Sequence, residues 1–174
     1  MSEKKQADRI ELGPEFADAL RYAYELHARQ NRKADKGDPV GPPYIGHLLA
    51  VAGMVIDEGG SEAEAIAALL HDAAEDQGGE ERLAKIEHRF GPEVAGIVRE
   101  CSDTTALDKE DWKDRKGRYI DHFANDASPS AVRVSLADKL YNARAIVRDH
   151  HVEGDEVWKR FSASKEETVH YYRR

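Results

Sequence analysis

The chain has 174 residues, of which 40% are hydrophobic and 34% charged, and its net charge is −8 at pH 7. The length is typical of one domain with a sizeable core, no apolar run approaches the roughly 18 residues of a membrane span, and the negative charge argues against a general nucleic-acid binder. A small anionic ligand remains compatible with this charge, because it needs only a local positive pocket or a metal ion.

The amino-terminal stretch and the cysteine content predict a cytoplasmic protein. Residues 1–13 contain no apolar segment of the kind that directs secretion. Cys101 is the only cysteine, which excludes a disulfide within the chain and fits a reducing compartment. We expect Cys101 to be a small buried helix residue rather than a nucleophile.

Helical periodicity recurs along the chain, and no strand-like alternation persists. Pro14 occupies the first turn of a helix that fades near residues 30–33. Ser61 predicts the cap of another helix, with Glu64 as its capping-box partner. The elements expected in this half are, in order, the helix from Pro14, a loop at Ala34–Pro43, a helix at Tyr44–Glu58, and the helix capped by Ser61 that carries AIAALLHDAAED and ends at Gly78-Gly79.

Glycine and proline divide the second half in the same way. Gly91-Pro92 separates two short helices, and Ser128-Pro129 opens a long one. The expected elements are helices at Glu80–Arg89 and Pro92–Cys101, a loop at Ser102–Asp111, a helix at Trp112–Ala124, a long helix from Ser128 through Val147, and a last helix from near Asp155. These elements predict an all-α fold of seven or eight helices in a single domain spanning 1–174, with a core at about 14–150 and a carboxyl-terminal helix at about 155–174.

The most informative ionisable cluster is His71, Asp72, Glu75 and Asp76 in the third predicted helix. Residues four apart lie about 40° apart around a helix axis, which places His71 over Glu75 and Asp72 over Asp76. The run 65–70 before them is wholly apolar, and burying such groups beside it is costly unless they are paired or bind a metal. A solvated helix end is the alternative, and His71 alone would more often be a satisfied core histidine. The four together favour a site.

Two further residues could complete that site. His47 is weak evidence alone, because a histidine in a first turn is usually structural or exposed. Asp138 lies inside the apolar stretch VRVSLADKLYNARAI, which is unusual for a purely structural aspartate. The alternative is a salt bridge to Arg133 or Arg144. Asn142 follows one turn after Asp138, on the same face.

Two imidazoles and two carboxylates are suitable ligands for Mn²⁺, Fe²⁺, Zn²⁺ or Co²⁺. The absence of cysteine ligands disfavours a structural zinc site. Four protein ligands would leave coordination positions for water and for a phosphate oxygen, and the ion would acidify that water and polarise the phosphoryl group. Glu75 and Asp76 could then orient the water and move its protons. The residues therefore predict a metal-dependent hydrolase of phosphate esters.

The order H…HD…D resembles the pattern of the HD superfamily of metal-dependent phosphohydrolases. The resemblance runs from about Ala19 to Ala145, and it is closest to the hydrolase domain of the RelA/SpoT family. In particular, the chain is similar to the small stand-alone members that remove the 3′-pyrophosphate of ppGpp. The segments that carry this likeness are RK…PYIGH, AALLHDAAED, RFGPEVAGIV and LADKLYNARAI.

The resemblance implies a role for each of nine residues. His47, His71, Asp72 and Asp138 would hold the metal ion, usually Mn²⁺. Glu75 and Asp76 would activate the attacking water. Arg32, Lys33 and Asn142 would hold the guanosine nucleotide, which suits the planar fork of arginine and the point charge of lysine. Without the family, Arg32 and Lys33 would be interpreted first as a solvated helix end.

The evidence for a functional role is weaker for two other groups of residues. Lys113 and Lys116 could face a polyphosphate at helical spacing, and a solvated face is the alternative. His150-His151 fall in an expected loop without a partner pattern and are not counted as ligands. About 30 residues follow Ala145, too few for a synthetase domain, so we expect hydrolysis only.

The sequence departs from the family at three places that bear on base specificity. The loop between Lys33 and Tyr44 is longer than usual, Leu48 stands where proline is common, and Gln77 replaces a threonine. Two other functions are therefore considered: an HD phosphohydrolase for another nucleotide, including NADPH, and a non-catalytic ppGpp-binding module. Intact Glu75 and Asp76 argue against the second.

Overall fold

The computed structural model describes residues 11–32, 41–103 and 111–173. These residues form eight α-helices and one 3₁₀ helix, and the strand-type pairing among them is a single bridge between Asn31 and Pro43. The predicted all-α class is confirmed. None of the helices described is long and apolar enough to cross a membrane. The bounds are α1 Pro14–Leu26, α2 Ile45–Asp57, α3 Glu62–Leu70, α4 Ala73–Gln77, α5 Gly79–Cys101, α6 Trp112–Asn125, α7 Pro129–Glu153, η1 Gly154–Arg160 and α8 Lys165–Arg173.

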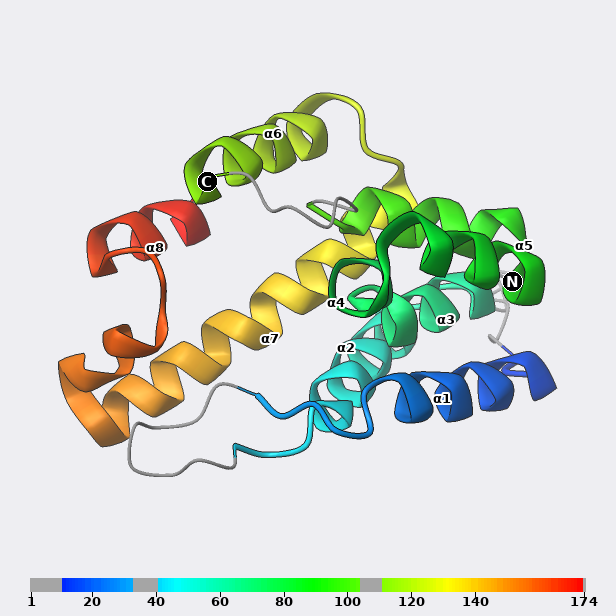
Figure 1. Cartoon of the computed structure of the whole chain (residues 1–174), viewed down its shortest axis with the longest axis horizontal. Helices are drawn as coiled ribbons and strands as arrows, with labels where there is room; N and C mark the ends of the chain where they lie inside the picture. Colours follow the sequence, from blue (N-terminus) through cyan, green and yellow to red (C-terminus); the bar gives the residue numbers. More distant parts are fainter. Residues whose placement is uncertain (1–10, 33–40, 104–110, 174) are drawn as a thin grey trace, which may run out of the picture.

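Helices α3 and α7 organise the core. Helix α3 packs against α1, α2, α5 and α7, and residues 65–70 are all buried because the run AIAALL has no polar side that could face water. Helix α7 crosses the molecule diagonally, with α5 beside its first turns and η1 at its far end (Figure 1). It also packs against α2, so the two helices that bear His47 and Asp138 lie side by side.

Local capping signals set the helix starts as predicted. The Ser61 hydroxyl accepts from the Glu64 backbone N–H, and the Glu64 carboxylate accepts from the Ser61 N–H, which completes the capping box of α3. The Ser128 hydroxyl caps α7 by accepting from the Ala131 backbone N–H, and Pro14 begins α1. Gly91, with φ +86°, kinks α5 at the predicted division.

The prediction that the third helix is one continuous element was wrong. Helix α3 ends at Leu70 and α4 begins at Ala73, so His71 and Asp72 form a turn between two helices. Neighbouring residues on an unbroken helix point about 100° apart. The turn relaxes that restriction, and it lets both side chains face the same point.

The carboxyl-terminal third also differs from expectation. Helix α7 continues to Glu153, so His150 and His151 lie in its last turn rather than in a loop. It ends at Gly154, whose φ of +63° suits glycine, whereas the apolar periodicity had faded several residues earlier. The single helix expected from Asp155 is instead η1 followed by α8.

We expect Leu69→Ala to lower the free energy of unfolding by about 2 to 5 kcal/mol. Leu69 is fully buried in α3, and the substitution would leave a cavity among four packed helices. Urea denaturation followed by circular dichroism measures the loss. Leu49→Ala is the matched control, because Leu49 is 46% exposed on α2, and it should cost much less.

A buried cluster of two histidines and two aspartates

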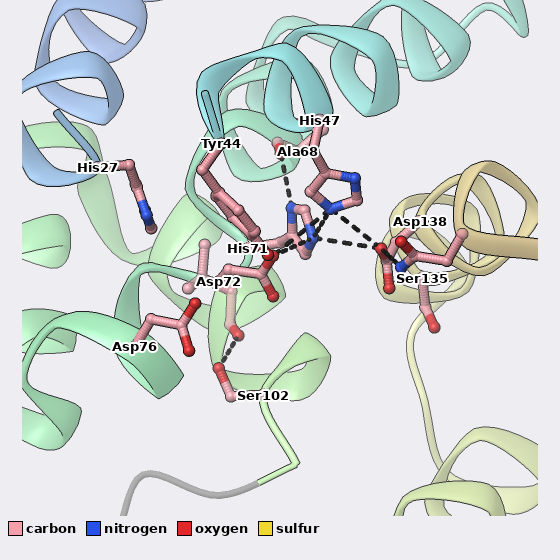
Figure 2. A network of polar contacts seen from close by, with 12 residues as sticks. His27, Tyr44, His47, Ala68, His71, Asp72, Asp76, Ser102, Ser135 and Asp138 are labelled. Carbon is pink, nitrogen blue, oxygen red and sulfur yellow. Dashed lines mark hydrogen bonds and ion pairs between the residues drawn. The ribbon is translucent and has the colours of Figure 1, made fainter. Parts of the chain in front are cut away.

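Four of the predicted site residues meet at one point between α2, the α3–α4 turn and α7 (Figure 2). The His71 Nε2 atom lies 3.0 Å from Asp72 Oδ2 and 3.7 Å from Asp138 Oδ1. The His47 Nε2 atom lies 3.2 Å from Asp138 Oδ1, 3.5 Å from Asp72 Oδ2 and 3.4 Å from His71 Nε2. His47, His71 and Asp138 are buried, and Asp72 closes the cluster from its more exposed side.

Both imidazoles are held so that Nε2 faces the cluster. His71 Nδ1 lies 2.8 Å from the Ala68 carbonyl oxygen and donates to it, which leaves a lone pair on Nε2 in the neutral ring. His47 has no partner for Nδ1 among the described residues. Packing orients its ring instead, because the rings of Tyr44, His71 and Tyr141 lie 5.1 to 5.3 Å away between centroids.

The two carboxylates have different supports. Tyr44 donates its hydroxyl hydrogen to Asp72 Oδ2 at 2.5 Å. Asp138 accepts from Lys139 Nζ at 2.6 Å through Oδ2 and from Asn142 Nδ2 at 2.5 Å through Oδ1. The salt bridge considered from the sequence is not formed by Arg133, which pairs with Glu64, and Arg144 lies against the Met54 sulfur.

This donor set fits a divalent metal ion. Two atoms that each bind one ion at about 2.1 Å, with an angle of 90° to 110° between the bonds, lie about 3.0 to 3.4 Å apart. Five separations between the four facing atoms, 3.0 to 3.7 Å, lie close to that range. Imidazole nitrogen and carboxylate oxygen are ligands for several first-row ions, and the buried His47, His71 and Asp138 group by itself suggests metal binding.

The cluster also predicts that metal affinity depends on pH. Burial alone would lower the pKa of His71, but Asp72 and Asp138 outweigh burial and hold that pKa well above its usual range. A metal ion must therefore displace a proton from His71, and affinity is lost as the pH falls below the raised pKa. We expect apparent affinity to rise about tenfold per pH unit while His71 is protonated. Calorimetry of metal-stripped protein in buffers of different ionisation enthalpy should report release of about one proton per ion. An affinity independent of pH would contradict the argument.

Glu75 and Asp76 lie on α4, immediately after the cluster. Both border the cavity of about 320 Å³ that His71, Asp72 and Asp138 also line. In Figure 2, Asp76 lies on the side of Asp72 away from Asp138. Its Oδ2 atom accepts from Gln30 Nε2 at 2.7 Å, and Glu75 Oε1 lies 3.9 Å from Arg115 Nη1. The turn at His71–Asp72 thus places two further carboxylates beside the four clustered residues.

The predicted nucleotide contacts are only partly brought together. Arg32 donates to Asn142 Oδ1 at 2.9 Å and lies over the Tyr141 ring, and Asn142 in turn donates to Asp138. Asn142 therefore links Arg32 to the cluster of histidines and aspartates. Arg32 borders an adjoining cavity of about 260 Å³, which shares Tyr44, Asn142, Phe161 and Tyr172 with the first. Lys33 and most of the predicted loop at Ala34–Pro43 lie outside the described residues.

The two lysines of α6 separate. Lys116 borders the first cavity, where Asp103 accepts from its Nζ at 2.5 Å. Lys113 does not line that cavity, and it pairs with Glu167 of α8 at 2.7 Å. Its side chain is 69% exposed, so the solvated face considered for this residue describes its position better.

Several residues that border the site were not predicted from the sequence. Tyr44 lies in the segment PYIGH with His47, and Lys139 lies in LADKLYN with Asp138. Their places in these two segments could have identified them as residues of the site. No sequence signal marked Asp103, because it follows α5 in a polar stretch. Its side chain is nonetheless 1% exposed and binds Arg115 and Lys116. Burial alone would raise the pKa of Asp103, but the two cations outweigh burial and hold it below its usual range.

Comparisons with known proteins agree with this geometry. The model of the HD domain family matches residues 19–169. MESH1 of Xenopus tropicalis, named a guanosine-3′,5′-bis(diphosphate) 3′-pyrophosphohydrolase, is 41% identical over 133 residues, which cover 75% of this chain and 69% of that protein. MESH1 of Homo sapiens, which carries the same name, is 37% identical over 139 residues, covering 79% and 74%.

Solved structures show the same relationship. A metazoan orthologue of SpoT, described as hydrolysing ppGpp, superposes with a TM-score of 0.66 at 30% identity, covering 92% of this chain and 95% of that one. A protein of Listeria monocytogenes superposes with a TM-score of 0.63 at 31% identity, covering 72% and 77%. The helical core, the clustered histidines and aspartates, and these likenesses together show that the chain belongs to the HD domain family, as a homologue of the MESH1/SpoT type.

Proposed function

We propose that this protein is a Mn²⁺-dependent guanosine-3′,5′-bis(diphosphate) 3′-pyrophosphohydrolase. The observation that carries the proposal is the convergence of two histidines and two aspartates on one point. Three of them, His71, Asp72 and Asp138, line a cavity that Glu75 and Asp76 also border. A site that only binds a nucleotide has no need of that second carboxylate pair. The names of the MESH1 relatives, at 37 to 41% identity over most of the chain, support the substrate.

His47, His71, Asp72 and Asp138 are the proposed metal ligands. The set contains two nitrogen and two carboxylate donors and no thiolate, which suits Mn²⁺. Bound there, the ion would supply Lewis acidity, lowering the pKa of a water molecule and polarising a phosphoryl oxygen. Tyr44, Lys139 and Asn142 keep the two aspartates in place through the hydrogen bonds at 2.5 to 2.6 Å.

Glu75 and Asp76 are the proposed acceptors of the proton from the attacking water. The water oxygen forms a bond to the phosphorus attached to the ribose O3′, and the bond from that phosphorus to O3′ breaks. O3′ leaves with a proton, so that water and ppGpp give GDP and pyrophosphate. A carboxylate can take the proton of the water only if it lies close to the phosphorus that the water attacks. Glu75 and Asp76 meet this requirement if the phosphate binds in the cavity that both border.

The cavity offers cations for the polyphosphate in spite of the net negative charge of the chain. Lys116 borders it directly, and Asp103 fixes the position of its ammonium group. Arg32 lies at the adjoining cavity, where its guanidinium carbon lies over the Tyr141 ring, 5.1 Å from the centroid. We assign Lys116 to the pyrophosphate, and Arg32, Lys33 and Asn142 to the nucleoside and its 5′-phosphates.

A substrate panel with the metal-reconstituted protein tests the proposal. We expect kcat/KM for ppGpp to exceed the values for ppApp, GTP and NADPH by at least about tenfold, with pyrophosphate as the inorganic product. Lys116→Met should raise KM for ppGpp by about tenfold, because it removes a charge-assisted contact. Lys113→Met is the matched control, and it should leave KM unchanged.

Each of the other readings has its own outcome in this panel. Release of orthophosphate from NADPH at a higher kcat/KM would assign the chain to the NADPH phosphatases. Tight binding of ppGpp without turnover, by protein that holds one equivalent of Mn²⁺, would assign it to the non-catalytic modules. Either result would overturn the proposed activity.

A further inference from the structure

A chain of hydrogen bonds leads from the buried end of α1 to Asp76. His27 Nδ1 lies 2.7 Å from Gln30 Oε1, and Gln77 Nε2 donates to the same oxygen at 3.0 Å. Gln30 Nε2 donates to Asp76 Oδ2 at 2.7 Å. None of these residues besides Asp76 has a place in the proposed chemistry.

The amide of Gln30 has one orientation that satisfies all its neighbours. A carboxylate only accepts hydrogen bonds, so the NH₂ group must face Asp76 and the carbonyl oxygen must face the other two residues. His27 can supply the matching hydrogen, because burial, its largest effect, lowers the pKa of this imidazole and favours the neutral ring with one N–H. With Nδ1 as the donor, His27 and Gln77 together prevent the Gln30 amide from turning over.

Asp76 needs such support because it lies between two open spaces. It borders the cavity of the metal cluster on one side, and on the other a cavity of about 530 Å³ that Glu25, Arg29 and Gln30 line. The side chain is exposed, so packing alone does not choose between its rotamers. The hydrogen bond from Gln30 holds the carboxylate.

Figure 2 shows how His27 lies relative to the cluster of histidines and aspartates. Tyr44 stands between His27 and Asp72, with its ring stacked on that of His27 at 5.3 Å between centroids. The His27 ring therefore packs against Tyr44, whose hydroxyl supports the proposed metal ligand Asp72. The Nδ1 atom of His27 supports Asp76 through Gln30.

We infer that Gln30 is a positioning residue, which keeps the Asp76 carboxylate turned so that its free oxygen can take the proton of the attacking water. His27 and Gln77 hold Gln30 in the orientation that this requires. The inference rests on the proposed function for the role of Asp76, and on the hydrogen bonds alone for its position.

The test replaces Gln30 with methionine, which is similar in shape and cannot form these hydrogen bonds. With Mn²⁺ and ppGpp, we expect Gln30→Met to lower kcat by about tenfold to a hundredfold, since small misplacements of reacting groups have effects of that size. KM, Mn²⁺ affinity and melting temperature should stay close to those of the unmodified protein. Gln30→Glu, which repels Asp76, should lose at least as much. Arg29→Met is the control, because Arg29 borders the same cavity of about 530 Å³ without belonging to this chain of hydrogen bonds.

A second measurement is independent of turnover. A crystal structure of Gln30→Met should show the Asp76 carboxylate rotated toward the cavity of about 530 Å³ or in more than one conformation. An unchanged Asp76 rotamer, an unchanged kcat in active protein, or a kcat that falls together with Mn²⁺ affinity and melting temperature would each overturn the inference. If the unmodified protein hydrolyses none of the nucleotides, the proposed function fails, while the crystal structure still decides whether Gln30 positions Asp76.

Discussion

Asp138→Asn is expected to lower kcat/KM for ppGpp by at least about a thousandfold, through loss of the bound metal ion. Metal catalysis contributes several kcal/mol of charge stabilisation in the transition state, and each 1.36 kcal/mol corresponds to about a tenfold change in rate. Asp138 supplies the Oδ1 atom that faces both His47 and His71. A neutral amide there is a much weaker ligand, so we expect bound Mn²⁺ to fall well below one equivalent.

The experiment measures Mn²⁺ content by mass spectrometry and turnover by release of pyrophosphate. Asp121→Asn is the matched control, because Asp121 is an exposed aspartate on α6 outside the cluster, and it should behave like the unmodified protein. Asp138 also pairs with Lys139, whose ammonium group would lose its carboxylate. His71→Ala therefore accompanies it, since that substitution leaves no cation unpaired. Retention of both the ion and the activity in either variant would remove these residues from the metal site.

Asp76→Asn and Glu75→Gln are expected to lower kcat by about a hundredfold to ten-thousandfold, the usual contribution of a general acid or base. Unlike the ligand variants, they should retain one equivalent of Mn²⁺, because neither carboxylate belongs to the clustered group. KM should change little, since the lost contact is made to the attacking water and not to the nucleotide. The separation of kcat from metal content distinguishes a water-activating pair from further ligands.

Steady-state kinetics and metal analysis on the same preparations provide the measurement. Glu81→Gln is the control, because Glu81 is an exposed carboxylate on α5 that pairs with Lys85. A variant of Glu75 or Asp76 that loses its metal would place that residue among the ligands. A variant with unchanged kcat would leave the proton of the attacking water without an acceptor from α4, and the proposed roles would have to be reassigned.

The sequence by itself determined most of the helical framework. Capping residues and apolar periodicity act within a few positions of one another, so Pro14, Ser61 and Ser128 marked helix starts that the structure confirms. The run 65–70 had no polar side, and it is buried on all sides. The same local character made the four clustered residues recognisable, because histidine and aspartate beside such runs need a partner.

The tertiary structure decided which side chains meet. A continuous helix over residues 62–77 was the best local reading, but two packed helices with a turn at His71–Asp72 let both residues face His47 and Asp138. The partner of Asp138 is Lys139 and not a distant arginine, and Lys116 reaches the cavity while Lys113 does not. Gln30 lies 46 positions before Asp76, and only the packing of α1 beside α4 brings their polar groups together. Helix formation depends on neighbours in the chain, whereas the contacts of the clustered side chains depend on neighbours in space. The sequence therefore determined most helices, and the tertiary structure determined which side chains meet.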